Sequence, residues 1–333
     1  MQRFQFFLLT LMLLGWVAPG QAQCVRGDCA DGVGMYSYPN GDQYTGEWRN
    51  GKRHGEGTYQ YRNGDVYEGE WKRDDMSGQG VMRYANGDVY TGEFADDAIN
   101  GEGTMRFANG SVYEGSWQNE EPHGQGTWRY PSGTVLTGEW TKGQVDGTAE
   151  YHYSNGDYYQ GGYKDNARHG QGTMTYANGG AYTGHWQDGR RHGQGKMEYP
   201  NGQVYEGQWQ AGRMEGQGKL TSPTGTVYTG EFRNNRYHGT GTLSYANGDE
   251  YDGEWVNGRK QGQGTYRYSD GGVYTGEWRV DKQHGQGRFE YADGKVYEGQ
   301  FVTGRPHGEG TLITPDGDTT SGVFQNGQLV NQR

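Results

Sequence analysis

The sequence predicts an all-β fold: an elongated, single-layer, twisted and curled antiparallel sheet of tandem 23-residue β-hairpin repeats. A 23-residue period runs through the chain without an insertion or a deletion. The chain also holds 64 glycines and 47 aromatic residues among 333, whereas disordered chains contain few aromatic residues. Leu, Ile, Val and Phe number only 39, too few for an ordinary layered core. Composition and period together indicate a repeat protein whose core consists of rings and glycines.

The period is clearest when Tyr44 is numbered as position 0 of the first repeat. Glycine occupies position +2 and an aromatic residue occupies position +4 in all thirteen repeats. Glycine also fills position +20 from Gly64 to Gly317, and positions +11 and +13 with Ala149 as the one exception. Most glycines therefore have a defined place in the repeat and are not low-complexity sequence.

Two turns divide each repeat. Positions +18 to +20 read Pro-Asn-Gly or Ala-Asn-Gly, as in 39–41 and 85–87. Proline cannot adopt the positive φ of a type I′ turn, so a type I turn followed by a left-handed glycine is expected, closing a bulged hairpin. A second turn is expected near position +7, where Gly alternates with Asn and Asp, residues that accept the left-handed region.

Two short strands lie between the turns, for example over 66–71 and 80–84. The first alternates apolar and polar side chains with period 2, and the second has apolar residues at positions +15 and +17. The aromatic residues at positions 0, +4, +15 and +17 are therefore expected on one face of the sheet, with the glycines at +2, +11 and +13 as gaps that receive the rings. One repeat cannot offset its own ordering entropy, so neighbouring repeats must stabilise one another.

The repeat resembles the MORN (membrane occupation and recognition nexus) repeat. The resemblance rests on Tyr-x-Gly-Glu-Trp followed by His-Gly-x-Gly-Thr, as in 44–48 and 54–58, and covers about 32–327. It implies consecutive antiparallel hairpins forming a groove-bearing sheet, and roles in scaffolding, dimerisation or lipid attachment. Leu136, Ala149, Gly162 and the turn at 222–224 depart from the pattern.

The two ends of the chain carry their own predictions. A positive residue, an apolar run over 6–14 and small residues before position 23 predict a signal peptide over 1–22, with a membrane anchor or lipidation at Cys24 as alternatives. Residues 23–31 are expected to cap the array, which spans 32–327, and 328–333 to form a C-terminal tail. Cys24 and Cys29 are candidates for a disulfide. We therefore expect export and a periplasmic or secreted protein.

The aromatic face is the best candidate for a binding groove, although a purely structural core explains it as well. Its open, single-layer geometry is expected to leave ring surface exposed for a protein, a second copy or a glycan chain. The groove residues predicted from the sequence are Tyr44, Trp48, Tyr67, Trp71, Trp117, Trp140, Trp186, Trp209, Trp255 and Trp278.

Two rows of polar side chains are further candidate sites. Histidine recurs at position +10, but neighbouring copies would stand ~10 Å apart, too far to share one zinc ion, so turn residues are the simpler interpretation. Glutamate recurs at position +3 on the opposite face, either as a solvated row or as a surface for a basic partner. The +3 carboxylates are Glu47, Glu70, Glu93, Glu139, Glu231, Glu254 and Glu277.

No catalytic motif, metal site or cofactor site emerges from the sequence, so no cofactor is expected. The net charge of −11 disfavours nucleic acid and anionic membranes as partners. The sequence therefore favours a non-enzymatic exported scaffold that binds protein or itself along the aromatic groove. The alternative is a module of the cell envelope that binds a glycan or a lipid surface.

Overall fold

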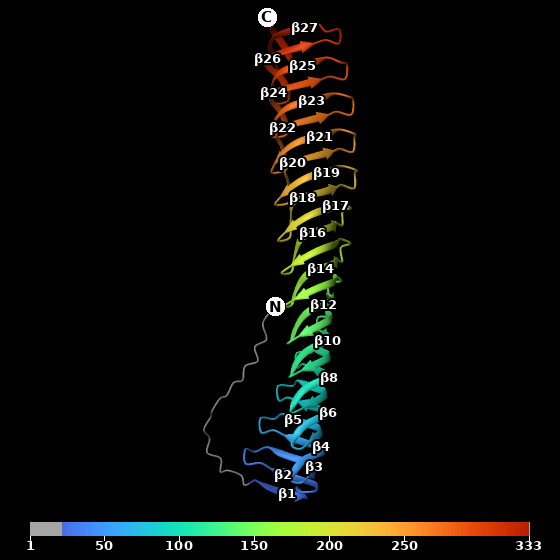
Figure 1. Cartoon of the computed structure of the whole chain (residues 1–333), viewed down its shortest axis with the longest axis vertical. Helices are drawn as coiled ribbons and strands as arrows, with labels where there is room; N and C mark the ends of the chain where they lie inside the picture. Colours follow the sequence, from blue (N-terminus) through green and yellow to red (C-terminus); the bar gives the residue numbers. More distant parts are fainter. Residues whose placement is uncertain (1–21, 333) are drawn as a thin grey trace. The chain divides into compact units, whose positions relative to one another are not determined.

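The computed structural model describes residues 22–332. The predicted signal peptide, apart from Ala22, lies outside the described residues. The described chain divides into two compact units, an N-terminal unit over 22–131 and a C-terminal unit over 132–332. Every strand within a unit pairs antiparallel with the strands before and after it in the chain, and the described residues contain no helix. The predicted all-β fold of tandem hairpins is confirmed (Figure 1).

The N-terminal unit contains ten strands, which pair in chain order. They are β1 (Gln23–Gly27), β2 (Gly32–Ser37), β3 (Gln43–Arg49), β4 (Lys52–Gln60), β5 (Val66–Lys72), β6 (Asp75–Arg83), β7 (Val89–Ala95), β8 (Ala98–Arg106), β9 (Val112–Gln118) and β10 (Glu121–Arg129).

The C-terminal unit contains eighteen strands, again paired in chain order. They are β11 (Val135–Thr141), β12 (Gln144–His152), β13 (Tyr158–Lys164), β14 (Ala167–Thr175), β15 (Ala181–Gln187), β16 (Arg190–Glu198), β17 (Val204–Gln210), β18 (Arg213–Thr221), β19 (Val227–Arg233), β20 (Arg236–Ser244), β21 (Glu250–Val256), β22 (Arg259–Arg267), β23 (Val273–Arg279), β24 (Lys282–Glu290), β25 (Val296–Val302), β26 (Arg305–Ile313), β27 (Thr319–Gln325) and β28 (Gln328–Gln332).

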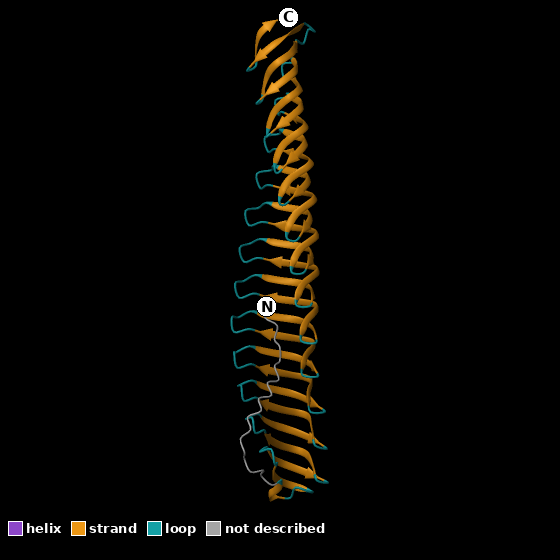
Figure 2. Cartoon of the chain, turned by 90° about the vertical axis from the view of Figure 1, so that its left-hand side faces the viewer, coloured by secondary structure: helices purple, strands orange, loops and turns teal. Residues whose placement is uncertain are grey.

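Both predicted turns are present and alternate along the strands (Figure 2). After β4, the Gly64 N–H donates to the carbonyl of Tyr61, and Gly64 has a φ of +97°, as expected for a type I turn closed by a left-handed glycine. Between β5 and β6, Arg73 and Asp74 both have positive φ, which is the two-residue type I′ turn. Because that turn is so short, β6 begins at Asp75, five residues before the predicted strand.

The glycine at position +11 has a different role from the one expected. Gly78 has a φ of +63°, and the register between β5 and β6 shifts on either side of it. Between the pairs Gly69–Gly80 and Trp71–Met76, β6 holds two residues more than β5. Position +11 is therefore the left-handed residue of a β-bulge that repeats along the sheet, and only the glycines at +2 and +13 receive the rings.

In the repeats that have a tyrosine at position 0, the core is that ring, which lies on two paired glycines. In the repeat that begins at Tyr205, Gly207 and Gly218 are opposite each other on β17 and β18. A β-carbon on Gly218 would lie 2.6 Å from Cε2 of Tyr205, and Tyr205 is fully buried. Glycine is required here because any side chain would occupy the space of the ring.

The repeat that departs from the pattern is explained by the same contact. Position 0 holds Leu136 in place of tyrosine, and Ala149 replaces glycine at +13, opposite Gly138. A leucine at position 0 has no ring to occupy the space at position +13, so a methyl group can be accommodated there. Leu136 and Ala149 are both buried, and β11, β12 and β13 keep the regular pairing.

Each end of the described chain carries one short additional strand. Cys24 and Cys29, the predicted pair, form a disulfide, which joins β1 to the loop that leads into its partner strand β2. Residues 328–332, predicted as a tail, form the strand β28 paired with β27. All residues of both terminal strands are exposed, since each of these strands pairs with a neighbour on one side only.

Candidate functional site

The ten rings predicted to line a groove form the packed layer of the sheet. Their exposed fractions lie between 0 % and 8 %, so almost none of their surface is open to a partner. The sequence left a binding groove and a purely structural core both open for these side chains, and their burial fits the core. That they bind a ligand stays a prediction, and the exposed part of this face is made of other residues.

Hydrogen bonds and ring contacts hold the packed layer in place. The Tyr205 hydroxyl donates to the Gln208 carbonyl at 2.8 Å, and the Trp209 indole N–H donates to the Gly195 carbonyl of the preceding repeat at 3.0 Å. Trp209 makes edge-to-face contacts with Tyr205 and Tyr182 at centroid distances of 5.0 and 5.5 Å. Each tryptophan therefore joins two repeats, and burial raises the pKa of the tyrosines.

A second row of rings reaches the surface, at position +17 directly after each long strand. All of these side chains are half-buried except Tyr291, which is exposed. Burial raises the pKa of Tyr84 and of Tyr245 to about 12. The row consists of Tyr38, Tyr61, Tyr84, Phe107 and Tyr130 in the N-terminal unit, and of Tyr153, Tyr176, Tyr199, Tyr245, Tyr268 and Tyr291 in the C-terminal unit.

The hydroxyl groups of this surface row differ from those of the buried tyrosines. Each tyrosine at position 0 donates to a backbone carbonyl, but within residues 22–332 the hydroxyls of Tyr84, Tyr176 and Tyr199 make no hydrogen bond to the chain. These phenol groups combine an apolar flank with an unused donor. The period-2 pattern that put position +17 on the ring face could have identified this row from the sequence.

Position +9 places cations among the rings in several repeats. The guanidinium carbon of Arg53 lies 4.2 Å from the centre of the Trp71 ring, and that of Arg191 lies 4.3 Å from Trp209. Lys260 is the most enclosed of them at 8 % exposure, with Nζ 4.2 Å from the Tyr266 ring and 5.0 Å from the Trp278 ring. Burial lowers the pKa of Lys260 to about 8, although Asp281 and Asp249 oppose the shift.

The glutamates at position +3 have a structural task. The carboxylate of Glu70 accepts the backbone N–H of Gln79 at 2.9 Å, and that of Glu254 accepts the N–H of Gln263 at 2.8 Å. Both bonds cross the β-bulge and satisfy a backbone donor that the shifted register leaves without a strand partner. This row lies on the face opposite the rings, as predicted, but it is more than a solvated surface.

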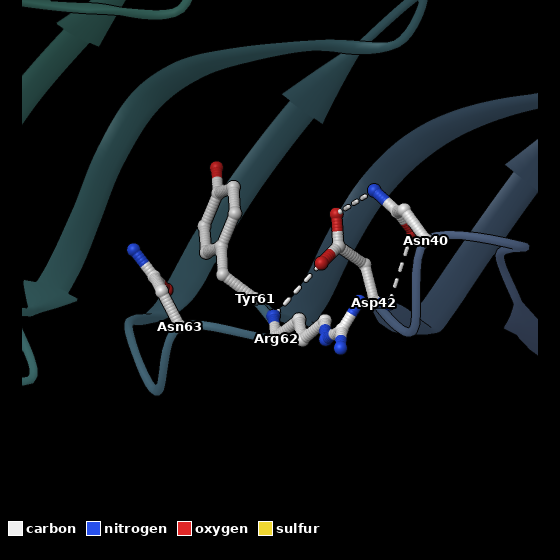
Figure 3. Close-up of a pocket in the computed structure, with 5 residues that line it drawn as sticks. All are labelled: Asn40, Asp42, Tyr61, Arg62 and Asn63. Carbon is white, nitrogen blue, oxygen red and sulfur yellow. Dashed lines mark hydrogen bonds between the residues drawn. The ribbon is translucent and has the colours of Figure 1, made fainter. Parts of the chain in front are cut away.

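Aspartates at position +21 link consecutive turns, as Figure 3 shows for Asp42. Its carboxylate accepts the Arg62 backbone N–H at 2.8 Å. It also accepts the Tyr59 hydroxyl at 2.8 Å. Burial alone would raise the pKa of Asp42, but these hydrogen bonds outweigh it and lower the pKa. An open hollow of about 530 Å³ lies beside this link, lined by Asn40, Asp42, Tyr61, Arg62 and Asn63.

The histidines at position +10 lie across the strand pair from position +3, for example His54 opposite Glu47. His185 takes the place of the glutamate in one repeat, and its ring centre lies 6.4 Å from that of His169 and 6.5 Å from that of His192. Among residues 22–332, no three or more His, Cys, Asp or Glu side chains are arranged to hold a metal ion. In the same residues, no helix has the length and apolar character needed to cross a membrane.

The comparisons with solved structures give only remote similarity. The TCP domain of SAS-4 (dCPAP) from Drosophila melanogaster, solved with a proline-rich motif of Ana2 (dSTIL), is 20 % identical, with 47 % of this chain and 90 % of that chain covered and a TM-score of 0.31. The TCP10 domain of CPAP from Danio rerio, solved with a STIL peptide, is 14 % identical, covering 73 % and 92 % with a TM-score of 0.31. A virginiamycin B lyase from Staphylococcus aureus is 8 % identical, covering 90 % and 87 % with a TM-score of 0.14. No curated protein matches the chain.

The family comparison is decisive. The model of the MORN repeat matches the chain in thirteen consecutive segments, which are 30–43, 44–66, 67–89, 90–112, 113–135, 137–158, 159–181, 182–204, 205–227, 228–250, 251–273, 274–296 and 297–319. These segments begin at the tyrosine of position 0 in almost every repeat, and the one that begins late omits Leu136. With nearly all of the described residues matched, the chain belongs to the family of MORN repeat proteins.

Proposed function

We propose that this MORN repeat protein is an exported, non-enzymatic scaffold that binds protein partners or a second copy of itself through its aromatic face. MORN repeats are in general scaffold repeats without catalytic residues. The observation that carries the proposal is the surface row of aromatic side chains at position +17. It replaces the ten buried rings as the part of the aromatic face that meets a partner.

The chemistry of the surface row suits a protein partner. A half-buried tyrosine offers ring area at a small cost in side-chain entropy, and its free hydroxyl gives direction to the contact. Tyr176 and Tyr199, one repeat apart, stand ~10 Å from each other. A partner that lies along the strand order therefore meets rings at regular intervals, as an extended segment or another MORN array would.

The sharpest test removes two neighbouring rings of the surface row. Ser222 already occupies position +17 in the next repeat, which shows that the fold accepts serine there. The double variant Tyr176→Ser/Tyr199→Ser therefore introduces a residue that is native at this position. Gln194→Ser/Gln217→Ser, with two exposed side chains of the opposite face, is the matched control. Sedimentation velocity of the purified protein over a range of concentrations measures self-association, and crosslinked pull-down from native extract measures partner binding.

We expect the tyrosine variant to lose self-association or its captured partner, and the glutamine variant to keep both. A wild-type protein that stays monomeric and captures no partner contradicts the proposal. Equal behaviour of the two variants contradicts the assignment to the surface row.

Export is the second part of the proposal and has its own test. The positive residue, the short apolar run and the small residues before position 23 support it. N-terminal sequencing of the protein isolated from the producing cell should begin at Gln23. A mature protein that still begins at Met1 would overturn this part and leave the scaffold role untouched.

A glycan- or lipid-surface-binding role remains the alternative. It predicts retention of the protein by envelope glycans or by liposomes when the surface row is intact, and loss of that retention in Tyr176→Ser/Tyr199→Ser. Such a result without any protein partner would favour the alternative.

A further inference from the structure

Position +8 forms an unbroken run of basic residues in the C-terminal unit. This position directly follows each type I′ turn, and in six consecutive repeats it holds an exposed arginine or lysine. The six residues, here called the basic edge, are Arg190, Arg213, Arg236, Arg259, Lys282 and Arg305.

The fold does not require a cation at this position. In the six preceding repeats the same position holds, in chain order, Lys52, Asp75, Ala98, Glu121, Gln144 and Ala167. All six of these residues begin a strand in the same way as the basic ones do. Acidic, neutral and basic side chains are therefore equally compatible with the turn, and the basic run needs another explanation.

The basic edge is also not neutralised within the chain. In the part of the chain that the structure describes, no ion pair joins any of its six side chains to a carboxylate. Arg213 donates to the side-chain oxygen of Asn234 at 2.7 Å. Few acidic residues lie near the basic edge in sequence. The carboxylate of Asp281 accepts the Lys260 backbone N–H, and that of Glu215 accepts the Asn234 backbone N–H. The side chain of Asp188 is exposed.

Two of the hairpins place like charges directly opposite each other. Arg233 pairs with Arg236 across the turn between β19 and β20, and Arg279 pairs with Lys282 between β23 and β24. Like charges at directly opposed positions of a sheet are destabilising. These like-charged pairs lower the stability of the isolated chain. An anion from outside the chain that binds between them would remove this repulsion.

The spacing of the basic edge is regular. Successive members are separated by two antiparallel strands, which corresponds to ~10 Å per repeat. Five of the six are arginines, whose planar fork binds carboxylate, sulfate or phosphate groups in a bidentate manner. A surface that repeats the same cation along six repeats fits a ligand that repeats the same anion along its own length.

From this arrangement we propose that the basic edge binds a linear acidic polysaccharide, through carboxylate or sulfate groups carried at regular intervals. Single-stranded nucleic acid fits less well, because base stacking needs rings at regular intervals, whereas only one member of the basic edge, Arg236, has an aromatic residue next to it in sequence, Tyr237. An anionic bilayer is the stronger competitor, since Val256, Val280 and Val302 are exposed at the same turns. The bilayer would, however, bring a broad negative surface against a chain of net charge −11, whereas a thin polymer follows only the basic edge. This site is separate from the aromatic face of the proposed function and does not depend on it.

The test compares two triple variants that remove the same charge. Arg213→Gln/Arg236→Gln/Arg259→Gln neutralises half of the basic edge, and Gln144 shows that glutamine is accepted there. The control, Arg83→Gln/Arg106→Gln/Arg129→Gln, removes three exposed arginines with the same 23-residue spacing from position +16 of the N-terminal unit. Binding of the purified full-length proteins to alginate and to dextran sulfate is measured by calorimetry at several salt concentrations, with uncharged dextran as the blank.

We expect the wild type to bind both polyanions and not dextran. Three lost surface ion pairs should weaken the affinity of the basic-edge variant by about tenfold and reduce its salt dependence, with less than about a twofold change in the control. Failure of the wild type to bind either polyanion overturns the proposal, as does an equal loss in the two variants. The wild type is also tested with phosphatidylglycerol vesicles and with single-stranded DNA. If it binds one of these more tightly than both polyanions, the polysaccharide proposal is overturned in favour of that partner.

Because the proposed function rests on Tyr176 and Tyr199, the two proposals can fail separately. Tyr176→Ser/Tyr199→Ser should bind alginate and dextran sulfate as the wild type does. The basic-edge variant should in turn keep the self-association or protein partner of the wild type.

Discussion

The ring of Tyr205 occupies the space where Gly218 would carry a side chain. Cε2 of the ring lies 2.6 Å from the β-carbon position of Gly218, and the Tyr205 hydroxyl is held by the Gln208 carbonyl. The ring cannot move away without breaking that hydrogen bond. This tyrosine–glycine contact recurs through both units and is the reason that the chain folds with so few aliphatic residues.

The first prediction concerns the pair itself. Gly218→Ala should lower the free energy of unfolding by about 3 kcal/mol, at the upper end of the usual cost of overpacking. In a Tyr205→Leu background the same alanine should cost less than about 1 kcal/mol, because native Leu136 already accompanies Ala149. Denaturant unfolding of the four proteins gives the coupling energy. Equal costs of the alanine in both backgrounds would mean that the ring does not impose the glycine.

The second prediction concerns the link between repeats at Trp209. Trp209→Phe removes the indole donor to the Gly195 carbonyl but keeps a ring, and should cost about 1 kcal/mol. Phe94, Phe232 and Phe301 are native at this position. Trp209→Ala also removes the contacts to two tyrosines and should cost about 3–5 kcal/mol. Thermal unfolding of the three proteins measures both values. Similar losses of stability in the Phe and Ala variants would show that the ring contacts do not contribute to stability.

The third prediction concerns the pH dependence that Lys260 introduces. Its pKa is lowered to about 8 in the folded protein by burial, against about 10.4 in the unfolded chain. Between these values the unfolded chain binds more protons, so the free energy of unfolding should rise with pH from about 8. At pH 7 the lysine is charged in both states and lowers stability.

Lys260→Met removes this effect, and Met76 and Met214 are native at the same position. The variant should be more stable than the wild type by about 2 kcal/mol at pH 7, and the difference should shrink toward pH 9.5. Urea unfolding at matched pH values measures the difference directly. A variant that is less stable at pH 7 would show that the contacts between the ammonium and the surrounding rings outweigh the cost of its burial. These rings are Tyr245, Tyr251, Tyr266 and Trp278.

The fourth prediction concerns the Cys24–Cys29 disulfide. Because β1 is exposed along its whole length and each strand depends mainly on its neighbours, Cys24→Ser/Cys29→Ser should change the main unfolding transition by less than about 1 kcal/mol. Amide hydrogen exchange should increase in β1 and β2 and stay unchanged from β3 onward. Loss of protection far from this end would assign the disulfide a larger role than a local clamp.

Much of the fold could be predicted from the sequence because its signals are local and repeated. The glycine of Pro39-Asn40-Gly41 predicts a left-handed turn residue, and the alternation of apolar and polar residues over 66–71 predicts a strand. The role of Gly78 could not be found in the same way, since a glycine under a ring and a glycine in a bulge look alike until the register between β5 and β6 is known.

The candidate site shows the same division. Periodicity placed Tyr44 and Trp48 on one face with Tyr38, but it gave no measure of how deeply each is covered. Trp48 is buried against the rings of Tyr36 and Tyr44, and its indole N–H donates to the Gly34 carbonyl, whereas Tyr38 follows β2 at a turn and stays half-buried. The basic edge is present in the sequence as a 23-residue series, but the negative net charge of the whole chain gives no sign of it.

The sequence by itself determined the repeat, its two turns and the face on which the rings lie, because backbone conformation at Gly, Asn and Pro and the period-2 geometry of a strand are local properties. Only the tertiary structure decided which rings are buried, that the Glu70 carboxylate holds a bulge, and that six cations stand in a row without a counter-charge. Those facts depend on register and on neighbouring strands, and residues a full repeat apart become neighbours only once the strands have paired.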